Sequence, residues 1–314
     1  MNPKQIHVYG PVPSRRLGFS LGVDILPYKT CTLDCIYCQL GRTPEKTLDR
    51  KHFFPKSEIL EHIQNKIQSG NRIDYITFSG SGEPTLYSGL GELIQDIKEL
   101  TDIPVAVLTN STTMPSSEVR KELMSADLVV PSLDAATQPV FEKVNRPHPD
   151  LRIEDIIQGL ALFNESFPGL LWIEILLVKG INDSDEHVHA LRKALDKIKP
   201  DKVQLNTVVR PPTESFARPL NFKELEHVQS QLNHNCEIVA DFTPKHQTAI
   251  SENLKESIFA MIRRRPVTLQ DIADSMGMHK NEVIKYLNIL LNENAVKTVA
   301  FENKTYYEPE ENQS

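Results

Sequence analysis

Two hydrophobic patterns alternate along the chain from about residue 20 to about residue 240. Short, continuous apolar runs predict buried strands at Phe19–Leu26, Ile73–Phe78, Val105–Thr109, Leu128–Val130, Leu171–Val178 and Lys202–Val209. Apolar residues at intervals of three and four predict helices at Ser57–Gln68, Leu90–Leu100, Ser117–Ser125, Ile153–Glu165, Asp185–Ile198 and Lys223–Leu232. Strands that alternate with helices run parallel and are covered on both faces. The pattern predicts an α/β fold, as a partial (βα)6 barrel or, as second choice, a doubly wound sheet.

The pattern changes after about residue 250. Lys255–Arg264 and Thr268–Met276 predict two helices, and Asn281–Asn292 predicts a third that is amphipathic. Two β-rich runs follow, Val296–Phe301 and Thr305–Tyr307. A helix, a helix–turn–helix and a hairpin in this order form a winged-helix arrangement. We therefore expect a barrel domain over residues 1–245, a winged helix-turn-helix domain over 250–308 and a disordered tail over 309–314.

Polar residues stand where the predicted strands end. The loop Ser79–Pro84 follows the second strand, Asn110 the third, Ser132 and Asp134 the fourth, and Lys179 the fifth. Active sites of parallel barrels form at the carboxyl ends of the strands. These residues are therefore expected at one edge of the sheet.

Three cysteines follow the first predicted strand with the spacing C-x3-C-x2-C, at Cys31, Cys35 and Cys38. Iron–sulfur clusters are held by thiolates on short loops, and a cubane normally takes four of them. Three thiolates would leave one iron open to another ligand, as catalytic zinc sites leave a position open. A structural zinc site and three unrelated buried thiols are the alternatives. For zinc, residues 39–51 contain no fourth Cys or His, and His52 is the nearest downstream candidate.

The composition is that of an ordinary globular protein. The chain has 314 residues, 39% of them hydrophobic, and a formal net charge of -7. This charge argues against a general polyanion-coating protein but leaves room for local basic patches such as Arg263-Arg264-Arg265, which a solvated surface explains equally well. No apolar run is long enough to span a bilayer, and the N-terminus has no signal-peptide core. We expect a cytoplasmic protein with reduced thiols and no membrane partner.

Together the cysteine loop and Ser79–Pro84 resemble the radical S-adenosylmethionine (SAM) superfamily, over roughly residues 10–245. The resemblance implies a [4Fe–4S] cluster on Cys31, Cys35 and Cys38, with SAM as a ligand of the fourth iron. It also implies that an electron from the cluster cleaves SAM to methionine and a 5′-deoxyadenosyl radical, which abstracts hydrogen from the substrate. A flavodoxin- or ferredoxin-like protein would supply the electron.

The same resemblance assigns cofactor contacts to further residues. Tyr37 would lie by the adenine, and Gly82, Glu83 and Pro84 match the last three positions of the family's G-G-E-P loop, with Ser81 in place of its first glycine. Contacts to the ribose and the methionyl carboxylate would come from Asn110, Ser132, Asp134 and Asn206, although such residues are often only turn formers.

Several segments resemble one branch in particular, the bacterial and archaeal group related to tRNA wyosine (wybutosine) synthase. They are Gly10–Gly18, Gln39–Arg42, Asn145–His148 and Val203–Pro212. Within the first, Arg15 and Arg16 are candidates to lean over the cluster or to anchor an anionic substrate, or they form an N-terminal salt bridge.

Two residues of the fifth predicted strand are further candidates. Lys179 is a candidate for a Schiff base or for holding a carboxylate, or it only caps its strand. Glu174 alternates with apolar neighbours, which indicates a carboxylate that points into the barrel.

The cysteine count limits what the branch implies. Wyosine synthase resembles a two-cluster enzyme with additional N-terminal cysteines, whereas this chain has none before Cys31 and only Cys236 elsewhere. Wyosine formation is therefore not expected, and the same count disfavours the RNA-adenine methylating radical enzymes.

We expect a radical SAM enzyme that modifies RNA, with tRNA as the preferred class of substrate. One alternative is the modification of a protein docked by the winged helix. Another is a non-enzymatic iron–sulfur redox sensor that binds DNA, which the SAM loop at Ser79–Pro84 disfavours because a sensor needs no SAM site.

Overall fold

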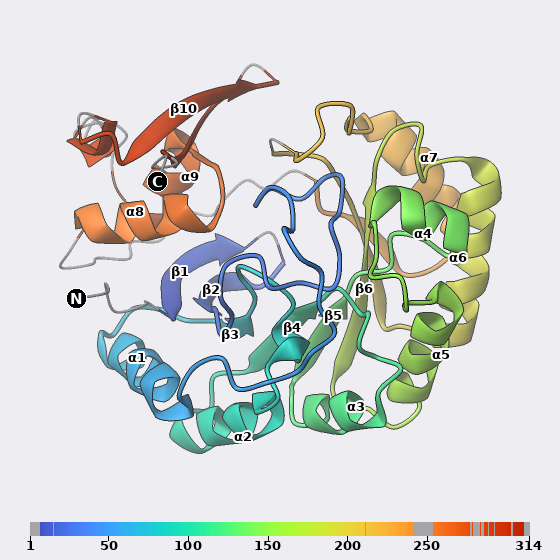
Figure 1. Cartoon of the computed structure of the whole chain (residues 1–314), viewed down its shortest axis with the longest axis horizontal. Helices are drawn as coiled ribbons and strands as arrows, with labels where there is room; N and C mark the ends of the chain where they lie inside the picture. The colour runs from blue at the N-terminus through green and yellow to red at the C-terminus, as the bar shows by residue number, and fades with distance from the viewer. Residues whose placement is uncertain are drawn as a thin grey trace.

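One large sheet organises most of the chain (Figure 1). The structure, a computed structural model, describes residues 7–14, 16–210, 212–240, 254–276, 278, 283, 286–287, 289–291, 293–302 and 304–310. The sheet has eight strands in sequence order: β1 (Val8–Ser14), β2 (Gly18–Val23), β3 (Tyr75–Phe78), β4 (Val105–Thr109), β5 (Leu128–Pro131), β6 (Leu170–Leu177), β7 (Lys202–Thr207) and β8 (Cys236–Ile238).

The strand order decides between the two predicted architectures. Strands β2 to β8 run parallel, each beside its neighbour in sequence, and β1 is antiparallel to β2. A doubly wound sheet would reverse its strand order, and this sheet does not. The carboxyl ends of the parallel strands therefore lie along one edge, as a barrel-like site requires.

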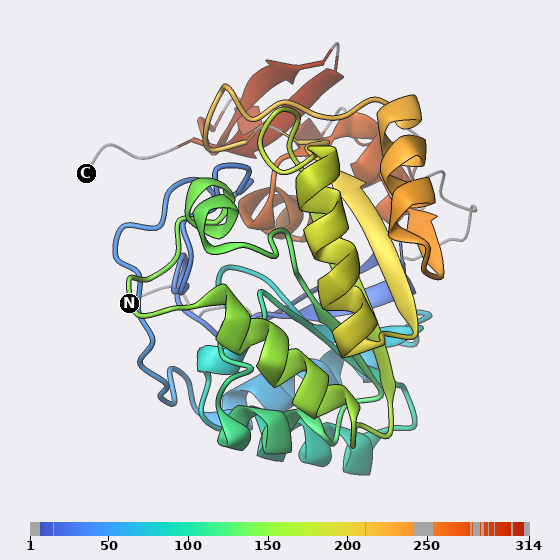
Figure 2. The same cartoon turned by 90° about the vertical axis from the view of Figure 1, so that its right-hand side faces the viewer.

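Helices connect the parallel strands and cover the outer side of the sheet (Figures 1 and 2). They are α1 (Lys56–Gln68), the 3₁₀-helix η1 (Pro84–Leu86), α2 (Leu90–Leu100), α3 (Ser117–Leu123), α4 (Gln138–Val144), α5 (Ile153–Asn164), α6 (Asp185–Ile198) and α7 (Phe222–Leu232). Their inward residues are apolar and buried, as Ile59 and Ile63 are in α1. The apolar residues that recur every three or four positions in the sequence are therefore the ones that pack these helices against the sheet.

Strand β1, the 3₁₀-helix η1 and helix α4 were not predicted in this part of the chain, and β8 is not among the six predicted strands. Strand β1 contains Gly10, Pro11 and Pro13, which read as a loop, yet it pairs with β2 along a ladder with an irregularity between Tyr9 and Val12. Helix α4 has only seven residues, too few to show a repeating apolar face.

A smaller unit of residues 254–310, here called the C-terminal module, packs against β1 (Figure 1). It contains α8 (Leu254–Arg264), α9 (Leu269–Met276) and a three-stranded antiparallel sheet of β9 (Val267–Thr268), β10 (Val296–Phe301) and β11 (Lys304–Pro309), in the order β10-β11-β9. Half of the residues of the predicted third helix, Asn281–Asn292, lie outside the described part of the chain. Strand β11 extends to Pro309, the first residue of the predicted tail, and residues 311–314 lie outside the described part.

The module shares its apolar core with the large sheet. Val12 of β1 belongs to the buried cluster that includes Ile258, Ile262 and Ile272 of the module. Apolar area is therefore buried between the two units, which fixes the module beside the first strands of the barrel. Among the described residues, no helix is long and apolar enough to cross a bilayer.

Gly159 of α5 provides a test of this packing. An added Cβ would overlap the carbonyl group of Met114, whose carbon would lie 2.5 Å away. Alanine normally stabilises a helix by about 1 kcal/mol relative to glycine, but here we expect Gly159→Ala to lower the free energy of unfolding by about 1–3 kcal/mol. Urea unfolding measures the change. A gain in stability would contradict the close approach of α5 to this loop.

Candidate active site

Each of the three clustered thiols accepts one hydrogen bond from a nitrogen. Lys29 Nζ lies 3.1 Å from Cys38 Sγ. The side-chain amides of Asn110 and Asn145 lie 3.5 Å from Cys31 Sγ and 3.4 Å from Cys35 Sγ, respectively. The thiols form no disulfide. Hydrogen bonds to sulfur are a main way in which proteins tune iron–sulfur clusters, so this donor set fits such a group.

The thiols do not form a site for one metal ion. Within the described part of the chain, no three His, Cys, Asp or Glu side chains converge closely enough to hold a single ion. Structural zinc needs four ligands around one ion. A cubane spreads its ligands over several irons, so it does not require the thiols to converge on one ion.

Lys29 was missed by the sequence reasoning. Its side chain is buried, with 6% exposed, and its backbone has a φ of 59° that non-glycine residues rarely adopt. Burial lowers the pKa of Lys29, but the nearby sulfurs of Cys38, Cys31 and Cys35 outweigh it, so that the pKa is raised. The cation is therefore held in place by the cysteine loop itself.

The segment Val144–His148 supports the cysteine loop along its length. The amides of Asp34 and Ile36 donate to the carbonyls of Asn145 and Val144, each at 3.0 Å, and the His148 amide donates to Thr32 at 2.9 Å. The sequence marked this segment only as typical of one branch. The structure brings it to the thiols, and no local pattern could have indicated a contact across about a hundred residues.

Tyr37 is held by a buried network. Its hydroxyl donates to Asp134, which also accepts from Asn145 Nδ2 at 2.8 Å and from the Leu176 amide at 2.9 Å. Burial raises the pKa of Asp134 to about 6, although these hydrogen bonds oppose the shift. The predicted cofactor residues Tyr37, Asn110, Ser132 and Asp134 line one small cavity beside the cysteine loop.

The loop Ser79–Pro84 lies directly against the residues that precede Cys31. The Lys29 amide donates to the Ser81 carbonyl at 2.6 Å, and the Glu83 amide donates to the Thr30 carbonyl at 3.0 Å. A Cβ at Gly82 would overlap the Thr30 carbonyl group. Glycine is therefore required here because two backbone segments meet without a side chain between them.

The Glu83 carboxylate accepts its hydrogen bonds from groups within the protein. It accepts hydrogen bonds from Thr109 Oγ1 and the Asn110 amide, both at 2.6 Å, and from the hydroxyl and the amide of Thr85. Pro84 begins η1 and is buried. Both residues shape the loop, and what the loop offers to a ligand is its backbone.

Ser81, the departure from the family's loop, has a defined role. Its hydroxyl donates to Asp24 Oδ2 at 2.5 Å, and Arg264 of α8 donates to the same carboxylate oxygen. Asp24 is buried at the end of β2. The serine therefore connects the loop to the C-terminal module through one carboxylate.

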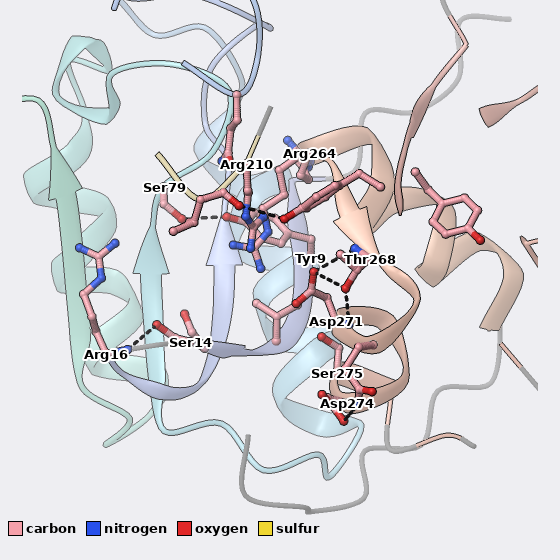
Figure 3. A pocket seen from close by; sticks show the side chains of 18 of the residues that line it. Tyr9, Ser14, Arg16, Ser79, Arg210, Arg264, Thr268, Asp271, Asp274 and Ser275 are labelled. Atoms are coloured by element: carbon pink, nitrogen blue, oxygen red, sulfur yellow. Dashed lines mark hydrogen bonds between the residues drawn. The ribbon is translucent and has the colours of Figure 1, made fainter. Parts of the chain in front are cut away.

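A cavity of about 1060 Å³ lies between the barrel strands and the C-terminal module (Figure 3). Arg16 lines it on the barrel side, and Thr268 and Asp271 line it on the module side. The loop Ser79–Pro84, here called the SAM-type loop, also borders it through Ser79 and Gly80. The cavity therefore opens beside the loop that the sequence associates with SAM.

Arg16 and Glu174, both singled out from the sequence, form an ion pair at 2.8 Å. Asn206 of β7 donates to the other oxygen of Glu174 at 3.0 Å. A buried ion pair with a second hydrogen bond is a specific polar arrangement inside an otherwise apolar barrel. Arg15 lies outside the described residues.

Lys179 is not brought to the cysteine loop. Its ammonium is half exposed and pairs with Glu224 of α7 at 2.6 Å, and it lines neither the small nor the large cavity. The structure therefore places Lys179 away from the cysteine loop, and its catalytic role stays a prediction. The turn after β6 instead directs Asn182 inward, where its amide donates to the Asp134 carbonyl at 2.8 Å.

Comparison with known proteins agrees with this geometry. A model of the radical SAM superfamily matches residues 25–192. A UPF0026 protein of Methanocaldococcus jannaschii is 31% identical over 95% of this chain and 94% of its own length. A protein of Brachyspira hyodysenteriae named GTPase Obg is 38% identical over 94% of this chain, which spans only 44% of that protein.

Two further proteins are similar to this chain at lower sequence identity. The dual-specificity RNA methyltransferase RlmN of Alkalilimnicola ehrlichii is 27% identical over 56% of this chain and 49% of its own length. The crystal structure of a radical SAM methyltransferase from Sphaerobacter thermophilus aligns with a TM-score of 0.54 at 16% identity, over 70% of this chain and 65% of that one. The structural match confirms the fold.

The donor set predicts which cysteines hold the cluster. After anaerobic reconstitution with iron and sulfide, we expect Cys31→Ala, Cys35→Ala and Cys38→Ala each to lose most of the cubane absorbance and iron content of the wild type. Cys236→Ala is the matched control, because Cys236 lies in β8 away from the loop. Equal cubane spectra in Cys31→Ala and Cys236→Ala would contradict the assignment.

The environment of Asp134 predicts a pH effect on the cluster-free protein. Its folded pKa of about 6 lies above the ordinary value of 3.8, so the folded state binds more protons between these two values. Its contribution to stability therefore falls as pH rises through this window, by an amount on the order of 1–3 kcal/mol. Urea unfolding at pH 4 and pH 6.5 should show this fall in the wild type and a smaller one in Asp134→Asn. Identical pH profiles would contradict it.

Proposed function

Because the chain belongs to the radical SAM superfamily, and within it to the UPF0026 proteins, we propose that it modifies RNA, with a tRNA base as the preferred substrate. Its cofactors are a [4Fe–4S] cluster and SAM. When bound, they supply the reductive cleavage of SAM and with it the means to abstract hydrogen from a substrate.

The chain's own residues hold and orient these groups. In this proposal Cys31, Cys35 and Cys38 are the cluster ligands, and their three nitrogen donors stabilise the sulfur anions. Gly82 leaves room for the backbone to approach the amino group of SAM. Tyr37, fixed by Asp134, lies on the adenine side.

The proposal of a large substrate rests on one observation. The cavity beside the SAM-type loop is walled on one side by the C-terminal module, so this module must contact whatever enters. We assign residues 250–308 to a winged helix-turn-helix domain, a fold that often contacts nucleic acid, and residues 1–245 to the catalytic barrel. The resemblance to the wyosine-synthase branch and the similarity to a protein named as an RNA methyltransferase support RNA.

The test combines two measurements. The reconstituted protein, reduced in the presence of SAM, should form 5′-deoxyadenosine, and unmodified RNA should increase its formation. Nucleosides of tRNA from deletion cells should lack a modification that returns when the wild-type gene, but not its Cys31→Ala variant, is restored. An unchanged nucleoside profile would reject RNA and favour a protein substrate.

A further inference from the structure

The run Arg263-Arg264-Arg265 ends in three different environments. Arg263 is exposed and lies over the ring of Phe259 at 5.8 Å. Arg264 pairs with Asp24 and covers the ring of Tyr9. Arg265 lines the large cavity, as Arg264 does, but it has no carboxylate partner among the described residues. The three arginines are therefore not one surface patch, and each needs its own explanation.

Arg265 places a positive charge in the cavity that no ion pair neutralises. Among the described residues its guanidinium makes no hydrogen bond or ion pair, although the side chain is half-buried. The nearby carboxylate of Asp271 already accepts from the amide and the hydroxyl of Thr268, both at 2.9 Å. A desolvated guanidinium with unused donors favours an anionic ligand.

A second guanidinium faces the same space. Burial lowers the pKa of Arg265, and the charge of Arg16 lowers it further, against the opposing influence of Tyr9 and Asp271. Arg16 is itself paired with Glu174, whereas no carboxylate among the described residues forms an ion pair with Arg265. An anion beside Arg265 would relieve the repulsion between the two arginines.

The C-terminal module also contributes an aromatic residue to this cavity. Tyr307 of β11 lines the cavity and is paired in register with Val267, two residues after Arg265. The hydroxyls of Tyr9 and Tyr306 bind Ser79 and the Val209 carbonyl. Among the described residues the Tyr307 hydroxyl has no such partner. A guanidinium beside an aromatic ring is a common way to hold a nucleotide, with the phosphate on the first and the base on the second.

We propose that this cavity binds one nucleotide of the substrate, with its phosphate on Arg265 and its base against Tyr307. The proposal rests on the proposed RNA function and adds the residues that recognise the substrate. Asp271, Asp274 and Glu302 also line the cavity, so it suits a single phosphate and not a continuous polyanion. Its volume of about 1060 Å³ accommodates a nucleotide with room for water.

Binding measurements on the full-length, cluster-loaded protein test the proposal. The probes are tRNA from deletion cells and the four nucleoside 5′-monophosphates. We expect Arg265→Ala to weaken tRNA binding at least about tenfold and to lower the slope of log affinity against log salt by about one. Arg265→Lys should recover part of the affinity. Arg263→Ala, the matched control, should change affinity less than about twofold, because Arg263 does not line the cavity. Tyr307→Leu should weaken binding with little change in the salt slope.

The outcomes separate this proposal from the proposed function. If the wild type binds tRNA and Arg265→Ala binds it as well as Arg263→Ala does, the cavity assignment is wrong while RNA remains the substrate. If only nucleoside monophosphates bind, and Arg265→Ala loses them, the cavity assignment holds and RNA is rejected. If no probe binds the wild type, both are wrong. Equal cubane absorbance in all variants shows that each is folded and loaded.

Discussion

The site depends on three cysteines that are half-buried and whose sulfur atoms must nevertheless carry negative charge. Burial raises the thiol pKa of Cys31 to about 11 and that of Cys35 well above its ordinary range, so burial disfavours the thiolate form of both. Metal ligation needs the thiolate. The nitrogens of Lys29, Asn110 and Asn145 lie where they would stabilise that anion. The folded site is therefore complete only with its cluster, and the donors reduce the electrostatic cost of loading it.

Those donors also explain how the barrel is held together at its active edge. They come from the loop after β2, the end of β4 and the segment after α4. Each of these three segments therefore donates to one sulfur. The SAM-type loop joins the same assembly through the contact of Gly82 with Thr30, and Asp24 extends it to Arg264 in the C-terminal module. A buried ion pair of this kind adds specificity more reliably than net stability, because its desolvation cost is large. Its consequence here is that the position of the module and the shape of the SAM-type loop cannot vary independently.

The periodic strands and helices could be predicted from the sequence. The contacts between residues far apart in the chain could not. The six predicted parallel strands correspond to β2–β7, and helices α1–α3 and α5–α7 were placed within a few residues, because buried faces impose a period. Strand β1 escaped because its prolines and glycine resemble a loop, and Lys29 and Asn145 escaped because their sulfur partners are set by tertiary structure. Lys179 shows a different limit of the sequence. Its place at a strand end was read correctly, but the turn after β6 sends Asn182 inward and Lys179 toward Glu224. Position along a strand fixes the edge of the sheet, not the direction of each side chain in the turn that follows.

The charge of the cavity is a second property that the sequence alone does not predict. The net charge of -7 and the acidic residues between the basic ones gave little reason to expect an anion site. A bound substrate, however, responds to the electrostatic potential inside the cavity and not to the net charge. A single desolvated guanidinium there interacts with an anion far more strongly than an exposed cluster of charges screened by water and salt. Of three consecutive arginines, Arg263 is solvated, Arg264 is neutralised by Asp24, and Arg265 keeps an uncompensated charge beside the SAM-type loop. What distinguishes them is the direction in which the end of α8 presents each residue, and this follows from packing the module against β1. The electrostatic character of the site is therefore a product of the fold, and composition alone could not reveal it.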